Sequence, residues 1–97
     1  MRTFYSDYIQ HCLRFYVRHP RPSFKSSADK ANWLACDDTL KRLSEDEREL
    51  ISLVYRERDS ITDCVYEASA KHNISQDKVW NLISDVELKI AKRRGLI

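Results

Sequence analysis

The side chains best suited to recognise another molecule gather near the C-terminus, in residues 75–94. The amides of Gln76 and Asn81 each place a hydrogen-bond donor beside an acceptor, which matches the major-groove edge of adenine. Trp80 can pack on a thymine methyl group, and serine and lysine can hold phosphate oxygens. The sequence therefore indicates contact with duplex DNA, and the candidate DNA-contacting residues are Ser75, Gln76, Asp77, Lys78, Trp80, Asn81, Ser84, Lys89, Lys92, Arg93 and Arg94.

Some of these candidates have a second interpretation. Asp77 and Asp85 disfavour close contact with DNA, because phosphate repels a carboxylate. Trp80 is equally suited to a protein core or to a dimer contact. The basic residues of positions 89–94 either reach the DNA backbone or form a solvated last helical turn, where cations offset the negative end of the helix dipole.

These candidates need a rigid support, and residues 60–84 have the pattern of a helix-turn-helix. Such a motif requires a small residue where two helices approach, a residue that tolerates positive φ some four positions later, an apolar residue, a helix N-cap and an apolar anchor. The residues that meet these requirements are, in chain order, Ser69 and Ala70, Asn73, Ile74, Ser75 and Val79. An ordinary helical hairpin without a role in DNA binding is the structural alternative.

Apolar residues recur at helical spacing elsewhere too, and one glycine and two prolines are too few for the turns of an all-β domain. Pro20 and Pro22 must end the first helix, and Ser44 followed by Glu47 forms a capping box that begins the third. The predicted fold is all-α, a single domain of about five helices with a C-terminal helix-turn-helix. The expected helices span residues 3–18, 26–43, 44–55, 60–72 and 75–94.

The apolar stripes of these helices predict the core. The residues expected to be buried are Phe4, Tyr5, Tyr8, Ile9, Cys12, Leu13, Tyr16 and Val17; Trp33, Cys36, Leu40 and Leu43; Leu50, Ile51, Val54 and Tyr55; Ile61, Val65, Ala68 and Ile74; and Val79, Leu82, Ile83, Val86 and Ile90. The charged residues 56–59 offer nothing to bury and are predicted to form a loop.

Residues 1–25 form the first of two predicted sections, an aromatic helix and a basic connector with two prolines, and residues 26–97 form the section with the helix-turn-helix. The aromatic helix is expected to complete the core by packing over the third and fourth helices. Two alternatives stay open: an aromatic surface for a second copy or RNA polymerase, or an auxiliary phosphate-binding arm. The residues concerned are Phe4, Tyr5, Tyr8, Phe15 and Phe24 for the surface, and Arg14, Arg18, Arg21 and Lys25 for the arm.

Two segments resemble region 4 of sigma-70-type transcription factors and related small regulators of bacterial phages and mobile elements. Residues 43–55 join a leucine, an acidic run, Arg-Glu and an apolar run that ends in tyrosine, and residues 74–80 follow in the helix-turn-helix. The resemblance covers residues 40–95, although the family usually has glycine where this turn has Asn73. It implies a transcriptional regulator that reads promoter or operator DNA with the helix 76–94, and RNA polymerase is a further candidate partner.

Charge is uneven along the chain, although its formal net value is only +2. Residues 1–30 hold six Lys or Arg against two acids, residues 71–97 hold six against three, and residues 31–70 hold five against ten. Basic ends are typical of a polyanion partner and also occur on solvated surfaces. The acidic middle favours a second hypothesis, a protein-interaction module that docks on RNA polymerase or another regulator without binding DNA. A homodimer is compatible with both hypotheses.

Other functional classes have little support. The three cysteines, Cys12, Cys36 and Cys64, lack the close spacing of zinc ligands, so reduced, half-buried thiols are expected, rather than a metal site shared with the histidines, and no cofactor. Without paired carboxylates in an apolar setting or a glycine-rich phosphate loop, an enzyme is not expected. No stretch approaches the roughly 18 apolar residues of a membrane span, and no signal peptide begins the chain, so a cytoplasmic location is predicted.

Overall fold

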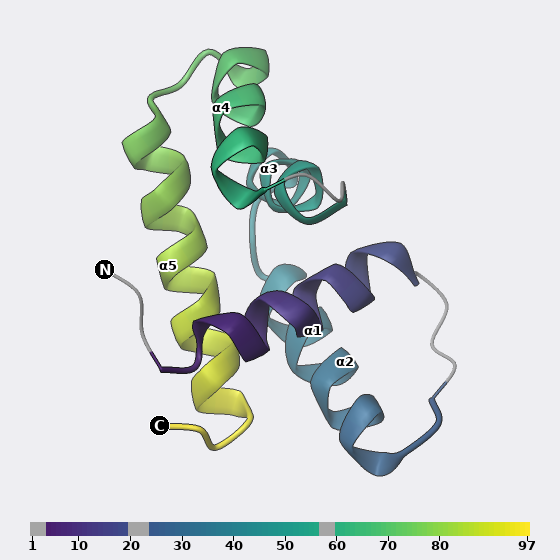
Figure 1. Ribbon diagram of the computed structural model, residues 1–97. Coiled ribbons are helices and arrows are strands. Elements are labelled where there is room, and N and C mark those ends of the chain that lie inside the picture. Colours follow the sequence, from purple (N-terminus) through teal and green to yellow (C-terminus); the bar gives the residue numbers. More distant parts are fainter. Residues whose placement is uncertain (1–3, 20–23, 57–59) are drawn as a thin grey trace.

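The computed structural model describes residues 4–19, 24–56 and 60–97, and these residues form five α-helices and no strands (Figure 1). The helices are α1 (Ser6–Arg18), α2 (Ser27–Leu40), α3 (Glu45–Arg56), α4 (Ile61–His72) and α5 (Gln76–Arg93). Their radius of gyration is 12.8 Å, close to the value of about 12.5 Å for a compact domain of this length. The predicted all-α single domain is confirmed.

Serine side chains define where the helices begin. The Oγ atoms of Ser26, Ser60 and Ser75 each accept a hydrogen bond from the backbone N–H three residues later. At α3 the capping is reciprocal: the N–H of Glu47 donates to Ser44 Oγ, and the N–H of Ser44 donates to Glu47 Oε1. The predicted capping box and the serine caps of α2, α4 and α5 are therefore confirmed.

Several helix ends differ from the prediction. Arg56, expected in the loop, is instead the last residue of α3, where the helix dipole favours a cation. α2 ends at Leu40 rather than at residue 43, because the N–H of Leu43 donates back only three residues, to the oxygen of Leu40. This tight turn brings Ser44 into position to cap α3. α1 begins at Ser6 rather than at residue 3, and the preceding Tyr5 already lies in a turn.

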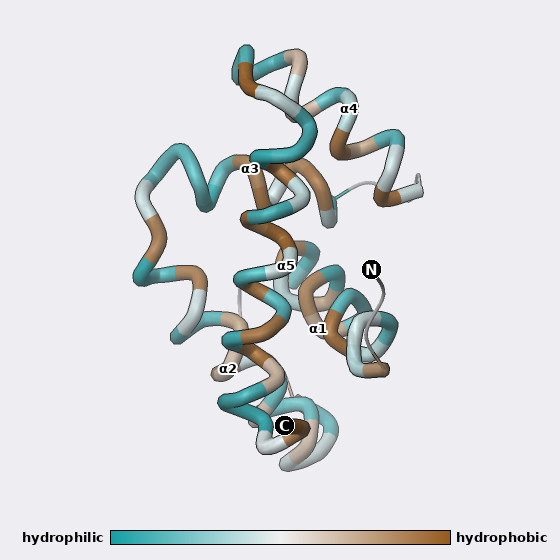
Figure 2. Tube along the Cα trace, turned by 90° about the vertical axis from the view of Figure 1, so that its left-hand side faces the viewer, coloured by the Kyte–Doolittle hydropathy of each residue, from teal (hydrophilic) through white to brown (hydrophobic). Residues whose placement is uncertain are grey.

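α5 is the central element of the fold, since it packs against each of the other four helices. Apolar and polar residues alternate around the helices rather than forming one continuous apolar run (Figure 2). Four of the five stripe residues predicted for α5 and all four predicted for α3 are buried, and the fifth, Leu82, is half-buried. The core therefore forms around the inner face of α5.

The N-terminal helix packs differently from the prediction. α1 packs against α3, as predicted, but its other main contacts are with α2 and α5 rather than with α4, and Figure 1 shows it crossing the lower part of α5. Ile9 and Leu13 are fully buried, but Phe4 is 83% exposed and Tyr8 is 42% exposed. Trp33 is only half-buried, because it lies at the edge of the core, where it packs on the ring of Tyr16.

Several predictions fall outside the described residues. They are the start of the first helix at Thr3, the proline connector with Arg21 at positions 20–23, and residues 57–59 of the predicted loop. In the described parts of the chain, none of the helices combines the length and the apolar character that a membrane span requires.

Candidate nucleic-acid interface

The turn between α4 and α5 positions the proposed reading helix. Asn73 has φ 54° and ψ 47°, the left-handed conformation that ends α4. Its N–H donates to the oxygen of Ala70, and the N–H of Ile74 donates to the oxygen of Ser69, a Schellman pattern. Ile74 then packs partly buried against the core. Three residues, 73–75, thus join two helices that diverge from the turn in Figure 1.

The small residue where α4 approaches its neighbours is Ser69, which is buried. Ala70, predicted from the sequence as part of the same contact, is exposed instead. One helical step separates the two side chains by about 100°, so only one of them can face the core. The hydroxyl of Ser69 donates to the oxygen of Tyr66, which satisfies this polar group inside the helix.

The first half of α5 presents polar side chains to solvent. Gln76, Asp77, Lys78, Asn81 and Ser84 are all exposed. Within the described part of the chain, no hydrogen bond or ion pair engages these five side chains. Ser75 differs, because its oxygen already caps α5 by accepting from the N–H of Lys78, although its hydroxyl hydrogen can still be donated to a phosphate. The amides that could read bases are therefore unengaged and held on a rigid helix.

Spacing along α5 divides the exposed residues between two neighbouring stripes. Asp77, Asn81 and Ser84 follow one another at intervals of four and three residues and share one stripe. The other stripe holds Lys78 together with Asp85, Lys89 and Lys92. In it, Lys89 Nζ lies 2.9 Å from Asp85 Oδ2, so this carboxylate offsets one of the cations. The stripe with Asn81 is thus the better candidate for base contact, and the stripe with Lys78 for phosphate contact.

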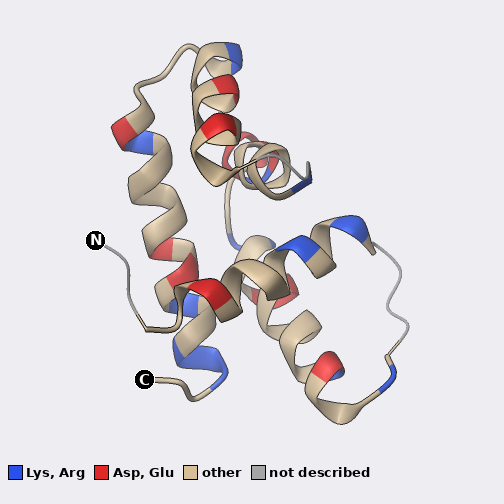
Figure 3. Cartoon of the chain, in the orientation of Figure 1, with Lys and Arg blue, Asp and Glu red and all other residues tan. Residues whose placement is uncertain are grey.

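The end of α5 is basic, as the blue region at its lower end shows in Figure 3. Lys89, Lys92 and Arg93 line a groove of about 320 Å³ together with Arg42 from the turn after α2. Sequence patterning missed Arg42, because only the tertiary fold brings that turn beside α5. The four cations make this groove the strongest positive feature on α5.

Arg94 does not line this groove, although it lies beside Arg93 on the side of α5 that faces α2. It is half-buried, and its Nε donates a hydrogen bond to Oδ1 of Asn32 in α2. Gly95 follows with φ 71°, and the N–H of Leu96 returns to the oxygen of Ala91. The turn that ends the helix therefore directs Arg94 toward α2 and away from the groove that Lys92 and Arg93 line.

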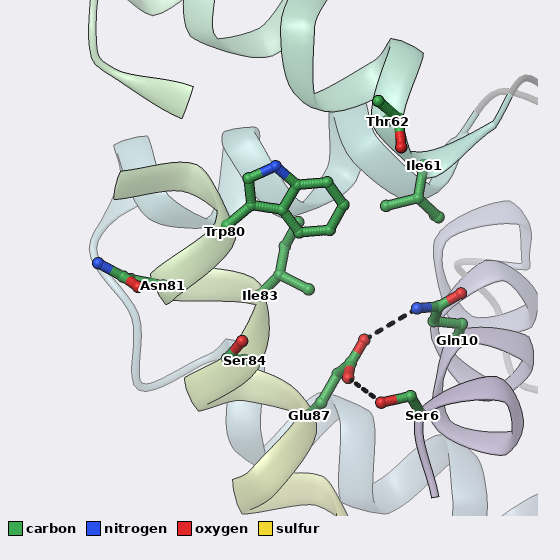
Figure 4. A pocket seen from close by; sticks show the side chains of 9 residues that line it. All are labelled: Ser6, Gln10, Ile61, Thr62, Trp80, Asn81, Ile83, Ser84 and Glu87. Atoms are coloured by element: carbon green, nitrogen blue, oxygen red, sulfur yellow. Dashed lines mark hydrogen bonds between the residues drawn. The ribbon is translucent and has the colours of Figure 1, made fainter. Parts of the chain in front are cut away.

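Trp80 lies between the core and the surface. It is half-buried, packs against the core, and lines a groove of about 560 Å³ between α1, α4 and α5 (Figure 4). Asn81 and Ser84, two other candidates for base contact, line the same groove. The indole therefore contributes to packing and still presents part of its surface to a partner.

The same groove holds Glu87, which the sequence analysis did not single out. Its side chain is almost fully buried, with 6% exposed, and accepts hydrogen bonds from Ser6 Oγ at 3.0 Å, Gln10 Nε2 at 3.2 Å and Tyr55 Oη at 3.3 Å. Burial and the negative charge of Glu87 raise the pKa of Tyr55, so the phenol stays protonated and donates. An acid four residues after Ile83 and four before Ala91 was the available signal, since these two positions face the core.

The cysteines are more deeply placed than the half-buried positions expected. Cys12, Cys36 and Cys64 are all buried, and no disulfide links any two of them. Burial raises the pKa of the Cys12 thiol to about 11 and raises that of Cys36 as well, which disfavours the reactive thiolate. Among the described residues, no group of three or more His, Cys, Asp or Glu side chains is placed to hold a metal ion.

Comparison of this chain with models of protein families, with curated proteins and with solved structures finds no match. The resemblance to sigma-70 region 4 therefore stays a prediction from the residues. A function can be inferred only from the geometry of α4, its turn and α5.

Proposed function

We propose that this protein is a DNA-binding transcriptional regulator that inserts the first half of α5 into the major groove of duplex DNA. The observation that carries this proposal is the set of unengaged polar side chains on a helix whose opposite face is fixed in the core. Gln76 and Asn81 are exposed, whereas Val79 between them is fully buried. Because the core already holds this helix in place, presenting the amides to base edges requires few other side chains to become ordered.

The turn supports the proposal because it separates the exposed face at the beginning of α5 from the end of α4. A short connection in the left-handed conformation ends α4, and Ser75 caps the next helix at once. The N-terminal end of a helix also carries the positive end of its dipole, which favours a nearby phosphate. Under this proposal Ser75 and Lys78 hold phosphate, while Gln76 and Asn81 contact bases.

The experiment is fluorescence anisotropy of the purified full chain with labelled duplexes of random sequence, titrated at several salt concentrations. Binding should weaken as salt increases, with each neutralised phosphate contributing about −0.9 to the slope of log affinity against log salt. A preferred sequence selected from a library should then bind more tightly than the random duplex. Absence of binding at low salt would overturn the proposal.

A second candidate function is a protein-interaction module that docks on RNA polymerase or another regulator. The acidic first turn of α3 favours it, since Glu45 and Asp46 are exposed there and Glu49 is exposed one turn later. An acidic surface is repelled by DNA and attracted to basic protein surfaces. Binding of purified bacterial RNA polymerase to the wild-type chain, lost in a Glu45→Lys/Asp46→Lys variant that still binds DNA, would support this function; no binding to the polymerase would exclude that partner.

A further inference from the structure

The groove between α1, α4 and α5 has a charged floor and an aromatic wall. Figure 4 shows Glu87 directed toward α1, with Trp80 on the same helix and Thr62 on the facing helix α4. The volume of about 560 Å³ lies within the range of about 300–1,000 Å³ for small-molecule sites. The lining residues are Ser6, Gln10, Ile61, Thr62, Trp80, Asn81, Ile83, Ser84 and Glu87.

All the groups that contact the Glu87 carboxylate are neutral donors. They are a serine hydroxyl, a glutamine amide and a tyrosine phenol, and each donates its hydrogen to a carboxylate oxygen. Both carboxylate oxygens therefore accept: Oε2 from Ser6, and Oε1 from Gln10 and Tyr55. Ser6 begins α1, so the positive end of this helix dipole also lies beside the carboxylate.

In the described part of the chain no ion pair involves the Glu87 carboxylate, although the charge of Arg14 in α1 acts on the neighbouring Tyr55 phenol. Burial of a net charge is unfavourable unless an opposite charge accompanies it. A carboxylate offers about four acceptor positions, and three hydrogen bonds leave one of them for another donor. The face of an indole attracts cations as well, and Trp80 lines the same groove.

We propose that this groove binds a small organic cation whose ammonium or guanidinium group pairs with Glu87 and whose carbon chain packs on Trp80. The neutral polar residues of the rim, Thr62, Asn81 and Ser84, suit a ligand with further hydrogen-bonding groups. The evidence for this site does not depend on DNA binding, but Trp80, Asn81 and Ser84 also belong to the proposed DNA-facing side of α5, so the cation and DNA would share this side of the helix.

The test uses the full chain without DNA, and agmatine, which carries a guanidinium and an ammonium group, as the probe. Trp33→Phe makes Trp80 the only tryptophan, so its emission reports on the groove. Titration at constant ionic strength should give a saturating change in emission, whereas N-butylurea, a neutral analogue, should give none. A linear response without saturation, or an equal response to N-butylurea, would overturn the proposal.

Variants locate the binding. Glu87→Gln keeps the shape of the side chain and removes its charge, so agmatine should bind at least tenfold more weakly. The matched control is Glu67→Gln, which removes an exposed acid of α4 and should leave binding unchanged. Equal affinities in these two variants would contradict the assignment. If circular dichroism shows that Glu87→Gln does not fold, Thr62→Arg decides instead, because an arginine at the rim can fill the groove: lost binding supports the site, and unchanged binding overturns it.

Discussion

The two ends of α5 offer different chemistry to a partner. The first turns carry the free amides of Gln76 and Asn81, and the charges of Asp77 and Lys78 cancel. The last turns carry cations that gather with Arg42 from another part of the chain. Amides distinguish one base edge from another, whereas cations attract any phosphate. Sequence preference and overall affinity for DNA can therefore reside at separate ends of one helix.

Distance reinforces this division. Lys78 and Lys92 are separated by about 21 Å along the helix axis, at 1.5 Å per residue. The major groove is about 12 Å wide, so a helix whose beginning contacts bases has its end beyond the groove, beside the backbone. Variants of each end should therefore differ in their effects on affinity, salt dependence and sequence preference.

Removal of the basic end should have the largest effect. In Lys92→Ala/Arg93→Ala, the slope of log affinity against log salt should fall in magnitude by about 1.8, and affinity at 0.1 M salt should fall about 60-fold on every sequence. Anisotropy titrations on random and selected duplexes measure both quantities. Lys30→Ala/Lys41→Ala, which removes the same charge from exposed positions in α2 and directly after it, should change much less. An unchanged slope in the first variant would show that the basic end does not contact DNA.

Removal of either amide should act on preference instead. Gln76→Ala and Asn81→Ala should each cost about 2 kcal/mol on the preferred duplex, about a 30-fold loss, because a bidentate contact to one base disappears. The salt slope should stay unchanged, and binding to a random duplex of the same length should weaken far less. A loss that is equal on both duplexes would show that these amides do not read bases.

Lys78→Ala should have a smaller and uniform effect. Loss of one phosphate contact should change the salt slope by about 0.9 and lower affinity about eightfold at 0.1 M salt on all sequences. Lys30→Ala is the single-charge control, measured with the same duplexes. If the effect of Lys78→Ala depends on the sequence of the duplex, then this side chain contacts a base rather than the backbone.

The turn that separates α4 from α5 should give the smallest effect. Asn73→Ala should lower the free energy of unfolding by about 1 kcal/mol, since φ 54° is unfavourable for a residue with a Cβ and no stabilising amide. Asn73→Gly should remain within a few tenths of a kcal/mol of the natural protein, because glycine accepts this conformation freely. Urea unfolding followed by circular dichroism measures both changes. Equal stability of the alanine and asparagine forms would contradict the role assigned to the turn.

Local chemistry explains why much of the fold was predictable. The capping serines and the left-handed Asn73 act through bonds to residues within five positions, so their patterns are visible in the sequence. The exposed candidates for base contact were predicted for the same reason, since helical spacing alone separates them from Val79 and Ile83. The end of α2 was placed three residues too late, because apolar spacing continues through a turn as easily as through a helix.

Sequence patterns predicted five helices, most of their caps and the polar stripe at the beginning of α5, because these features depend on neighbours along the chain. Only the tertiary structure decided which distant groups meet: α1 against α2, α3 and α5, Arg42 beside Lys92, Arg94 turned to Asn32, and Ser6, Gln10 and Tyr55 around Glu87. The contacts between single residues join positions 32 to 81 apart, and the packed helices have no fixed spacing in the sequence. Periodicity records which face of a helix is apolar, but it carries no information about which other helix covers that face.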